Sequence, residues 1–197
     1  MEKILIVVDM QKDFVDGSLG TKEAQSIVPA VKDKIENFEG DIIFTKDTHE
    51  EDYLNTQEGQ NLPVKHCIRG TDGWELQSDL NDYALKNHCL IFDKPTFGST
   101  SLAGCVSGIA RMAPIDQIEI VGLCTDICVI SNAILLKTAL PDTEIIVDAS
   151  CCAGVTPQSH QNALEAMKMC RLQLPVYKGE LYDEKRQKQQ KNCRFAI

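Results

Sequence analysis

Residues 117–140, QIEIVGLCTDICVISNAILLKTAL, join two apolar segments of different length. The first, residues 117–123, is a short apolar run that is typical of a strand buried in a sheet. The second, residues 125–140, is a longer apolar segment that indicates a helix. A strand that passes directly into a helix predicts one unit of an α/β fold.

The same alternation continues on both sides of this unit. We expect strands at residues 3–10, 41–47, 88–94, 117–123 and 143–150. We expect helices at residues 24–38, 73–87, 99–112, 125–140 and 157–170. Repeated strand–helix units favour parallel strands with right-handed crossovers and helices on both faces. The sequence therefore predicts an α/β fold, a three-layer α/β/α sandwich with a mostly parallel sheet and Rossmann-like topology.

Two segments fall outside this pattern. Residues 48–72 show no clear period, and an irregular segment of this length usually carries function. Residues 176–197 form a polar tail that is richer in basic residues, which is either a frayed end or a helix that docks on a partner subunit. We therefore expect one domain over residues 1–175, followed by this tail.

Composition narrows the functional classes. The formal net charge of −9 opposes binding to nucleic acid, which needs a cationic surface. No apolar run is long enough to span a membrane, and the first strand stands where a signal peptide would lie. Nine cysteines, an odd number without a secretion signal, favour reduced thiols over disulfides. These features predict a cytoplasmic protein that acts on a small neutral molecule, without nucleic acid or membrane partners.

Polar side chains gather at the predicted carboxyl ends of the strands. Asp9, Asp47 and Lys94 end the first three strands, and Cys124 and Cys128 follow the fourth. Ligands of such sheets bind beyond the carboxyl ends of the strands. We therefore expect these side chains to face one crevice.

Cys128 is the better candidate nucleophile of the two cysteines. It is expected in the first turn of the helix at residues 125–140, where the helix dipole lowers the pKa of a thiol. Unpaired N–H groups in such a turn can also hold an oxyanion. Cys124 lies before the helix, so its thiol gains less from the helix dipole. Its N–H group is better placed to help hold the oxyanion. The alternative is that both cysteines are buried packing residues.

A thiolate also needs a proton acceptor. None of the four histidines follows a strand end in a way that suggests a Cys–His pair. Asp9 could serve as the base, and Lys94 could keep Asp9 ionised and offset the thiolate charge. The alternatives are a turn residue for Asp9 and a solvated surface residue for Lys94.

A second constellation lies at the end of the second strand. Asp47 and His49 are two residues apart, and His66 follows in the irregular segment. This set is compatible with a zinc, iron or manganese site. Taken alone, the same residues could also be ordinary polar residues of a long loop.

Three motifs, in order along the chain, resemble those of the isochorismatase-like cysteine hydrolases, and within that superfamily the nicotinamidases. They are VVDMQKDF at residues 7–14, DKPTFGST at residues 93–100 and GLCTDICV at residues 122–129. The resemblance runs from about residue 3 to residue 173. It implies a catalytic set of Asp9, Lys94 and Cys128, with the N–H groups of Cys124 and Cys128 as oxyanion donors. It also implies a cis peptide bond between Leu123 and Cys124.

The resemblance further implies a bound divalent metal and a ring-binding site. Asp47, His49 and His66 match the family's metal ligands, and Glu58 stands where some members have a fourth. Zinc is the first expectation, with iron and manganese as alternatives. The metal would bind the ring nitrogen of a pyridine carboxamide.

Aromatic side chains hold the ring in this family. Phe14 and Phe97 match two of them by position, whereas Leu62 stands where many nicotinamidases have an aromatic residue. The departure at Leu62 predicts a weaker hold on the ring or a different flat substrate. The family also tends to form homo-oligomers, so we expect one here.

The resulting hypothesis is a metal-dependent cysteine amidohydrolase that deamidates nicotinamide to nicotinate and ammonia through a thioester. One alternative is a related hydrolase that acts on another small amide or on isochorismate. Another is a catalytically silent domain that binds a metal or a partner. A dinucleotide-dependent oxidoreductase is excluded, because no glycine-rich turn follows the first strand.

Overall fold

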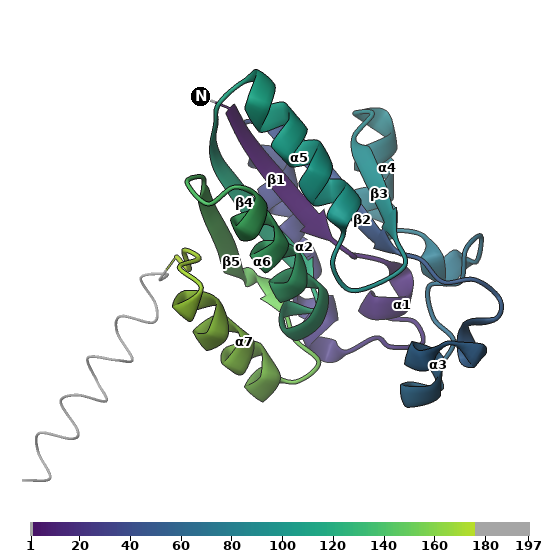
Figure 1. Ribbon diagram of the computed structural model, residues 1–197. Coiled ribbons are helices and arrows are strands. Elements are labelled where there is room, and N and C mark those ends of the chain that lie inside the picture. The colour runs from purple at the N-terminus through teal and green to yellow at the C-terminus, as the bar shows by residue number, and fades with distance from the viewer. Residues whose placement is uncertain (1, 176–197) are drawn as a thin grey trace, which may run out of the picture.

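A parallel sheet of five strands forms the middle layer of the fold, and the computed structural model describes residues 2–175 (Figure 1). In chain order the strands are β1 (Glu2–Val8), β2 (Asp41–Asp47), β3 (Leu90–Lys94), β4 (Ile115–Leu123) and β5 (Glu144–Ala153). Their order in the sheet is β3-β2-β1-β4-β5, and every pair is parallel. All their carboxyl ends therefore lie at one edge of the sheet.

Helices cover both faces of the sheet. They are α1 (Lys12–Val15), α2 (Lys22–Asn37), α3 (Gln57–Asn61), α4 (Ser78–Lys86), α5 (Thr100–Met112), α6 (Ile130–Ala139) and α7 (Pro157–Met169). In Figure 1, α5, α6 and α7 lie in front of the sheet, while α2 lies behind it. This arrangement confirms the predicted three-layer sandwich.

The central strand β1 shows why two helical layers form. Ile4, Ile6 and Val8 pack into one hydrophobic core with residues of α5, α6 and α7. Leu5 and Val7 point to the other face and pack with residues of α2 and α4. All five side chains are fully buried, as expected for a central parallel strand that is covered on both sides.

The structure differs from the sequence-based boundaries in the irregular segments. The helix expected at residues 73–87 begins only at Ser78, because the Gln77 side chain accepts hydrogen bonds from the next N–H groups and caps it there. The helix expected at residues 125–140 opens with a π turn over Thr125–Val129. The segment 48–72 contains a 3₁₀ turn, Tyr53–Asn55, and the short helix α3.

Two further differences are an additional helix and a longer strand. The short helix α1 was not expected, and β5 continues to Ala153 rather than residue 150. The predicted polar tail, residues 176–197, lies outside the described part of the chain. Within residues 2–175, no helix combines the length and apolar character needed to cross a bilayer.

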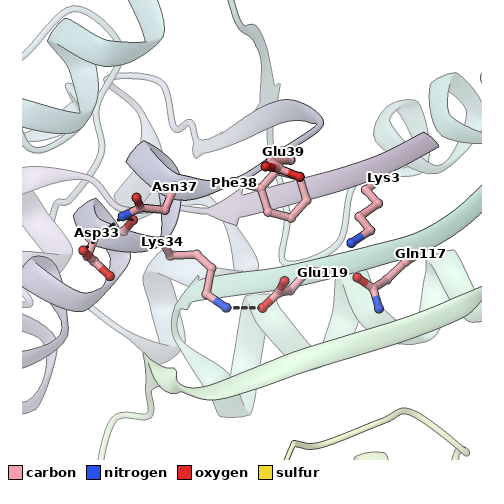
Figure 2. A pocket seen from close by; sticks show the side chains of 8 residues that line it. All are labelled: Lys3, Asp33, Lys34, Asn37, Phe38, Glu39, Gln117 and Glu119. Carbon is pink, nitrogen blue, oxygen red and sulfur yellow. Dashed lines mark hydrogen bonds and ion pairs between the residues drawn. The ribbon is translucent and has the colours of Figure 1, made fainter. Parts of the chain in front are cut away.

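A charged cluster ties α2 to the sheet on one face. Lys34 of α2 makes an ion pair with Glu119 of β4 (Figure 2). It makes a second ion pair, at 2.7 Å, with Asp148 of β5. Asp148 is fully buried. Burial lowers the pKa of Lys34, but the two carboxylates outweigh it and raise that pKa. Lys34 and Glu119 also line a hollow of about 370 Å³, which is separate from the site described below.

Replacing Lys34 should destabilise the fold. Lys34→Met keeps the apolar stem and removes the Lys34 ammonium group from beside the buried Asp148. Since Lys34 is partly exposed, we expect a loss of about 2–3 kcal/mol in the free energy of unfolding, below the ~3–5 kcal/mol of fully buried pairs. Urea denaturation measures it. The control is Lys32→Met on the same helix, whose ion pair with Asp79 is exposed. Equal midpoints for the two variants would contradict a structural role of the cluster.

Candidate active site

A mainly apolar cavity of about 520 Å³ opens at the carboxyl ends of the strands. Its walls come from the segment after β1, from the region around α3 and from the turn after β4. The lining side chains include Phe14, Leu19, Asp47, Glu58, Leu62, His66, Phe97, Cys124, Ile127, Cys128 and Val155. Enclosed apolar cavities with a few convergent polar groups are typical of small-molecule sites.

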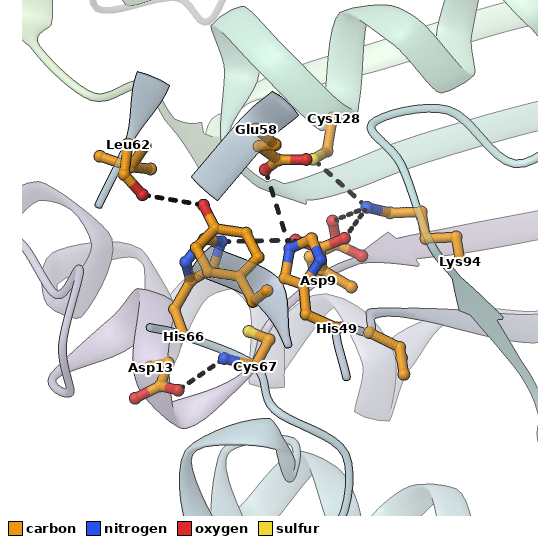
Figure 3. A network of polar contacts seen from close by, with 12 residues as sticks. Asp9, Asp13, His49, Glu58, Leu62, His66, Cys67, Lys94 and Cys128 are labelled. Atoms are coloured by element: carbon orange, nitrogen blue, oxygen red, sulfur yellow. Dashed lines mark hydrogen bonds and ion pairs between the residues drawn. The ribbon is translucent and has the colours of Figure 1, made fainter. Parts of the chain in front are cut away.

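The ammonium group of Lys94 contacts the other two residues that are expected to carry catalysis, Asp9 and Cys128. Lys94 Nζ lies 2.6 Å from Asp9 Oδ2 and 3.4 Å from Cys128 Sγ (Figure 3). Asp9 follows β1, Lys94 ends β3, and Cys128 lies in the π turn after β4. All three side chains are buried, with at most 4% of each residue exposed. The structure thus brings together groups that are far apart in the sequence.

The backbone around these groups explains their close approach. Asp9 has a φ of 47°, and its carboxylate accepts a hydrogen bond of 2.6 Å from the Thr45 hydroxyl. Gly122 has a φ of 117°, and a side chain there would lie 2.1 Å from the carbonyl oxygen of Val8. Only glycine therefore lets β4 approach β1 at this point. The Leu123–Cys124 peptide bond is cis, as the resemblance implied.

The electrostatics of Cys128 correct one sequence-based expectation. Burial raises the pKa of the Cys128 thiol well above its usual 9.0, and the neighbouring Asp9 carboxylate raises it further, while Lys94 opposes both. The expectation that a helix N-terminus lowers this pKa is therefore wrong. A helix dipole contributes less than complete burial beside a carboxylate.

The same environment sets the protonation of the other two groups. Burial raises the pKa of Asp9 above 3.8, and Lys94 only partly offsets it. Burial lowers the pKa of Lys94, but the charges of Asp9 and Cys128 outweigh it, so that pKa is raised. Near neutral pH, Lys94 is thus an ammonium beside the Cys128 thiol. Asp9 is a more basic carboxylate than usual, which suits a proton acceptor.

The thiol of Cys124, like that of Cys128, is harder to ionise than a free cysteine. Burial raises the pKa of Cys124 to about 12, and Asp126 and Asp9 add to the effect. The Cys124 carbonyl oxygen accepts hydrogen bonds from the N–H groups of Ile127 and Val129, both at 3.0 Å. These hydrogen bonds to the turn that carries Cys128 fix the position of Cys124 beside the cavity.

The four predicted metal ligands also lie together. One ligand atom from each of Asp47, His49, Glu58 and His66 lies within 4.8 Å of the other three. His49 Nε2 is 3.2 Å from Asp47 Oδ2 and 3.7 Å from Glu58 Oε1. His49 Nε2 is buried, and among the described residues no contact of it, that with Asp47 Oδ2 included, has the geometry of a hydrogen bond. A buried imidazole nitrogen of this kind fits a metal ligand, since buried polar atoms otherwise find partners.

The orientation of His66 fits the same role. His66 Nδ1 donates to the carbonyl oxygen of Val64 at 2.8 Å, so Nε2 carries the free lone pair. His66 Nε2 lies 3.8 Å from Asp47 Oδ2. A ligand histidine is typically oriented in this way by a carbonyl group on its other nitrogen. The donor set of two imidazoles and two carboxylates fits zinc, iron or manganese.

Asp47 connects the metal-binding group to the thiol. Asp47 Oδ1 lies 3.2 Å from Lys94 Nζ, while Oδ2 faces His49 and His66. Lys94 therefore contacts two carboxylates and one thiol at once (Figure 3). A cation placed among these groups reduces the repulsion between the two acids.

Several residues that support the site were missed by the sequence reasoning. Gln11 accepts a hydrogen bond from the N–H of Asp47 at 2.7 Å and donates to its carbonyl oxygen at 2.8 Å. Asp13 accepts one from the N–H of Cys67, next to His66, at 2.7 Å. Gln11 and Asp13 belong to the motif at residues 7–14, and that motif was the available signal.

Tyr53 and Asn132 gave no such signal in the sequence. The Tyr53 ring lies 4.5 Å from that of His49 and 5.0 Å from that of His66, between centroids. Asn132 is fully buried and donates to the Cys128 carbonyl oxygen at 2.8 Å. It also accepts from the N–H of Ser99 at 2.9 Å, so it ties the turn of Cys128 to the segment after β3.

The three expected ring-binding residues all line the cavity. The Phe14 ring lies 5.5 Å from that of His66, between centroids. Phe97 and Leu62 are also partly open to solvent, with 43% and 39% of each residue exposed. Phe14 lies beside the metal-binding group.

Known proteins resemble this chain in sequence and in fold. The isochorismatase domain family matches residues 3–174. The nicotinamidase/pyrazinamidase of Mycobacterium tuberculosis is 26% identical over 192 residues, which cover 87% of this chain and 97% of that protein. The structure of a pyrazinamidase/nicotinamidase from Streptococcus mutans matches with a TM-score of 0.75 and 29% identity, and covers 88% of this chain and all of that one. A pyrazinamidase from Pyrococcus horikoshii in complex with zinc matches with a TM-score of 0.72 and 26% identity, over 90% of this chain and all of that one.

The raised pKa of Cys128 should be visible in its reaction with iodoacetamide. We expect the alkylation rate of Cys128 to keep rising with pH beyond 9.0, because only the thiolate reacts. Asp9→Asn removes one cause of the shift, so its profile should move to lower pH. Mass spectrometry of the Cys128 peptide measures the rate, and exposed Cys170 is the internal reference. A wild-type rate that levels off below pH 9.0 would contradict the assigned protonation state.

Proposed function

Because the chain belongs to the isochorismatase family, we propose that it is a cysteine amidohydrolase that deamidates nicotinamide to nicotinate and ammonia. The observation that carries the proposal is the contact of one ammonium, Lys94, with both the Asp9 carboxylate and the Cys128 thiol. This cluster borders an apolar cavity that also contains the metal-binding group. A flat aromatic amide suits such a cavity, with its amide near the sulfur.

The proposed reaction begins with attack by sulfur. Asp9 takes the proton of Cys128, and the sulfur attacks the carboxamide carbon to form a tetrahedral intermediate. The N–H groups of Cys124 and Cys128 hold its oxyanion. Asp9 then gives the proton to the departing nitrogen, so that ammonia leaves and a thioester remains.

Water completes the cycle. Asp9, again a carboxylate, removes a proton from a water molecule that attacks the thioester carbon. The carbon–sulfur bond breaks, nicotinate leaves, and Cys128 regains its proton. Lys94 stays an ammonium throughout, and it offsets the charge that moves between Asp9 and the sulfur.

The metal-binding group orients the substrate in this proposal. Asp47, His49, Glu58 and His66 would hold a divalent metal, which would bind the ring nitrogen of the pyridine carboxamide. We propose zinc, since the ligands are two imidazoles and two carboxylates, and iron or manganese are the alternatives. Phe14 and Phe97 would flank the ring.

One feature of the cavity favours a second candidate, a related hydrolase of another small amide. Leu62 lines the wall where many nicotinamidases have an aromatic residue, so the ring would be held less tightly. The proposed cytoplasmic location and a homo-oligomeric state stay predictions. Ammonia release from a panel of nicotinamide, pyrazinamide and aliphatic amides would separate the two candidates.

Cys128→Ala should reduce ammonia release from nicotinamide to the background rate, because no thioester can form. Cys170→Ser, at an exposed thiol away from the cavity, should retain the wild-type rate. The assay is run with the metal-stripped protein and after the addition of zinc, iron(II) or manganese(II). Retained turnover in Cys128→Ala would refute the mechanism. Equal turnover with and without each metal would refute the role assigned to the metal.

A further inference from the structure

The turn that carries Cys128 is held from two sides, and only one of them has been described. Asn132 fixes it from within α6. On the other side lies the segment that joins β5 to α7, together with the first turn of α7. Two pairs of residues connect this segment to the turn by hydrogen bonds, and both pairs include a residue of the π turn Thr125–Val129.

The first connection is a side-chain pair. The Thr125 hydroxyl and His160 Nδ1 share a hydrogen bond of 2.7 Å. Thr125 is fully buried and begins the π turn, whereas His160 is half-buried on α7. A hydrogen bond in such a setting restrains the buried partner more than one in open water.

The second connection involves the neighbouring residue. The N–H of Val155 points at the Asp126 carboxylate, 3.2 Å from Oδ1 and 3.3 Å from Oδ2. Val155 also lines the cavity. Two successive residues of the turn are therefore held by the same segment.

The start of α7 is itself fixed firmly. Thr156 forms a capping box with Ser159, and Pro157 occupies the beginning of the helix. Gly154 packs so closely on His160 that a side chain at Gly154 would lie 2.8 Å from the His160 backbone nitrogen. His160 thus extends from a rigid support, which is what positioning of a reactive group requires.

We propose that His160 is a positioning residue, which acts through Thr125 to keep the Cys128 turn in its reactive geometry. His160 acts on the turn through its hydrogen bond to Thr125. The inference rests on the proposed function for its turnover measurement. It also makes a claim about the turn alone, which does not depend on the substrate.

Two replacements of His160 separate positioning from packing. Asparagine places an amide oxygen or nitrogen near the place of Nδ1, so His160→Asn can keep the bond to Thr125 with either donor–acceptor sense. Phenylalanine keeps the ring but has no polar atom, so His160→Phe loses the bond. If His160 only fills space, His160→Phe should change amide exchange and kcat less than His160→Asn does. If His160 positions the turn, His160→Asn should change them less.

Hydrogen exchange tests the claim about the turn. For His160→Phe we expect the amides of residues 125–129 to exchange about three- to tenfold faster than in wild type, the loss of one net hydrogen bond. His160→Asn should stay near wild type, and Thr125→Val should match His160→Phe. The control is Gln161→Phe, at an exposed position of α7 outside the cavity. Unchanged exchange of these amides in both His160→Phe and Thr125→Val would overturn the proposal.

Steady-state kinetics with nicotinamide give the second measurement. His160→Phe should lower kcat by about tenfold with KM within twofold, because a misplaced nucleophile slows chemistry more than binding. The double variant with Thr125→Val should be no worse than either single variant. A larger loss in His160→Asn than in His160→Phe would overturn the proposal. If wild type shows no turnover, the proposed function fails, while the exchange experiment still decides the role of His160.

Discussion

The site depends on the contact of one buried ammonium with two acids and a thiol. Lys94 ends the short strand β3, yet it contacts Asp9 beyond β1, Asp47 at the end of β2 and Cys128 beyond β4. Two buried carboxylates this close would repel each other strongly without a cation between them. The parallel sheet makes the arrangement possible, because all strands deliver their carboxyl ends to one edge.

Burial, which the contact with Lys94 only partly offsets, explains why the thiol and the base differ from their usual states. The Cys128 thiol is harder to ionise than a free cysteine, and Asp9 is more basic than a free aspartate. We therefore expect Cys128 to be a thiol rather than a thiolate before the substrate binds. Asp9, the proton acceptor, lies in the same cluster, so ionisation of Cys128 and its attack on the substrate can occur together. The cavity and the metal-binding group would then serve to place the amide.

Much of this could be predicted from the sequence, because the information was local. Apolar runs fixed the strands, and Asp9, Lys94 and the turn of Cys128 follow directly from where those runs end. The direction of the Cys128 pKa could not be predicted. It depends on burial and on a carboxylate more than 100 residues away in the sequence. The supporting contacts of Asn132 and His160 could not be predicted from the sequence either, because each joins elements that only the fold brings together.

The central claim is that Lys94 is the shared counter-ion of the site, and the ionisation of Asp9 tests it most directly. Carbon-13 NMR of the Asp9 carboxyl group gives its titration midpoint in wild type and in Lys94→Met, with circular dichroism to show that the variant is folded. The account predicts a midpoint above 3.8 in wild type and a higher one in the variant, because the cation that favours the carboxylate is gone. A midpoint that does not move when Lys94 is removed would contradict it.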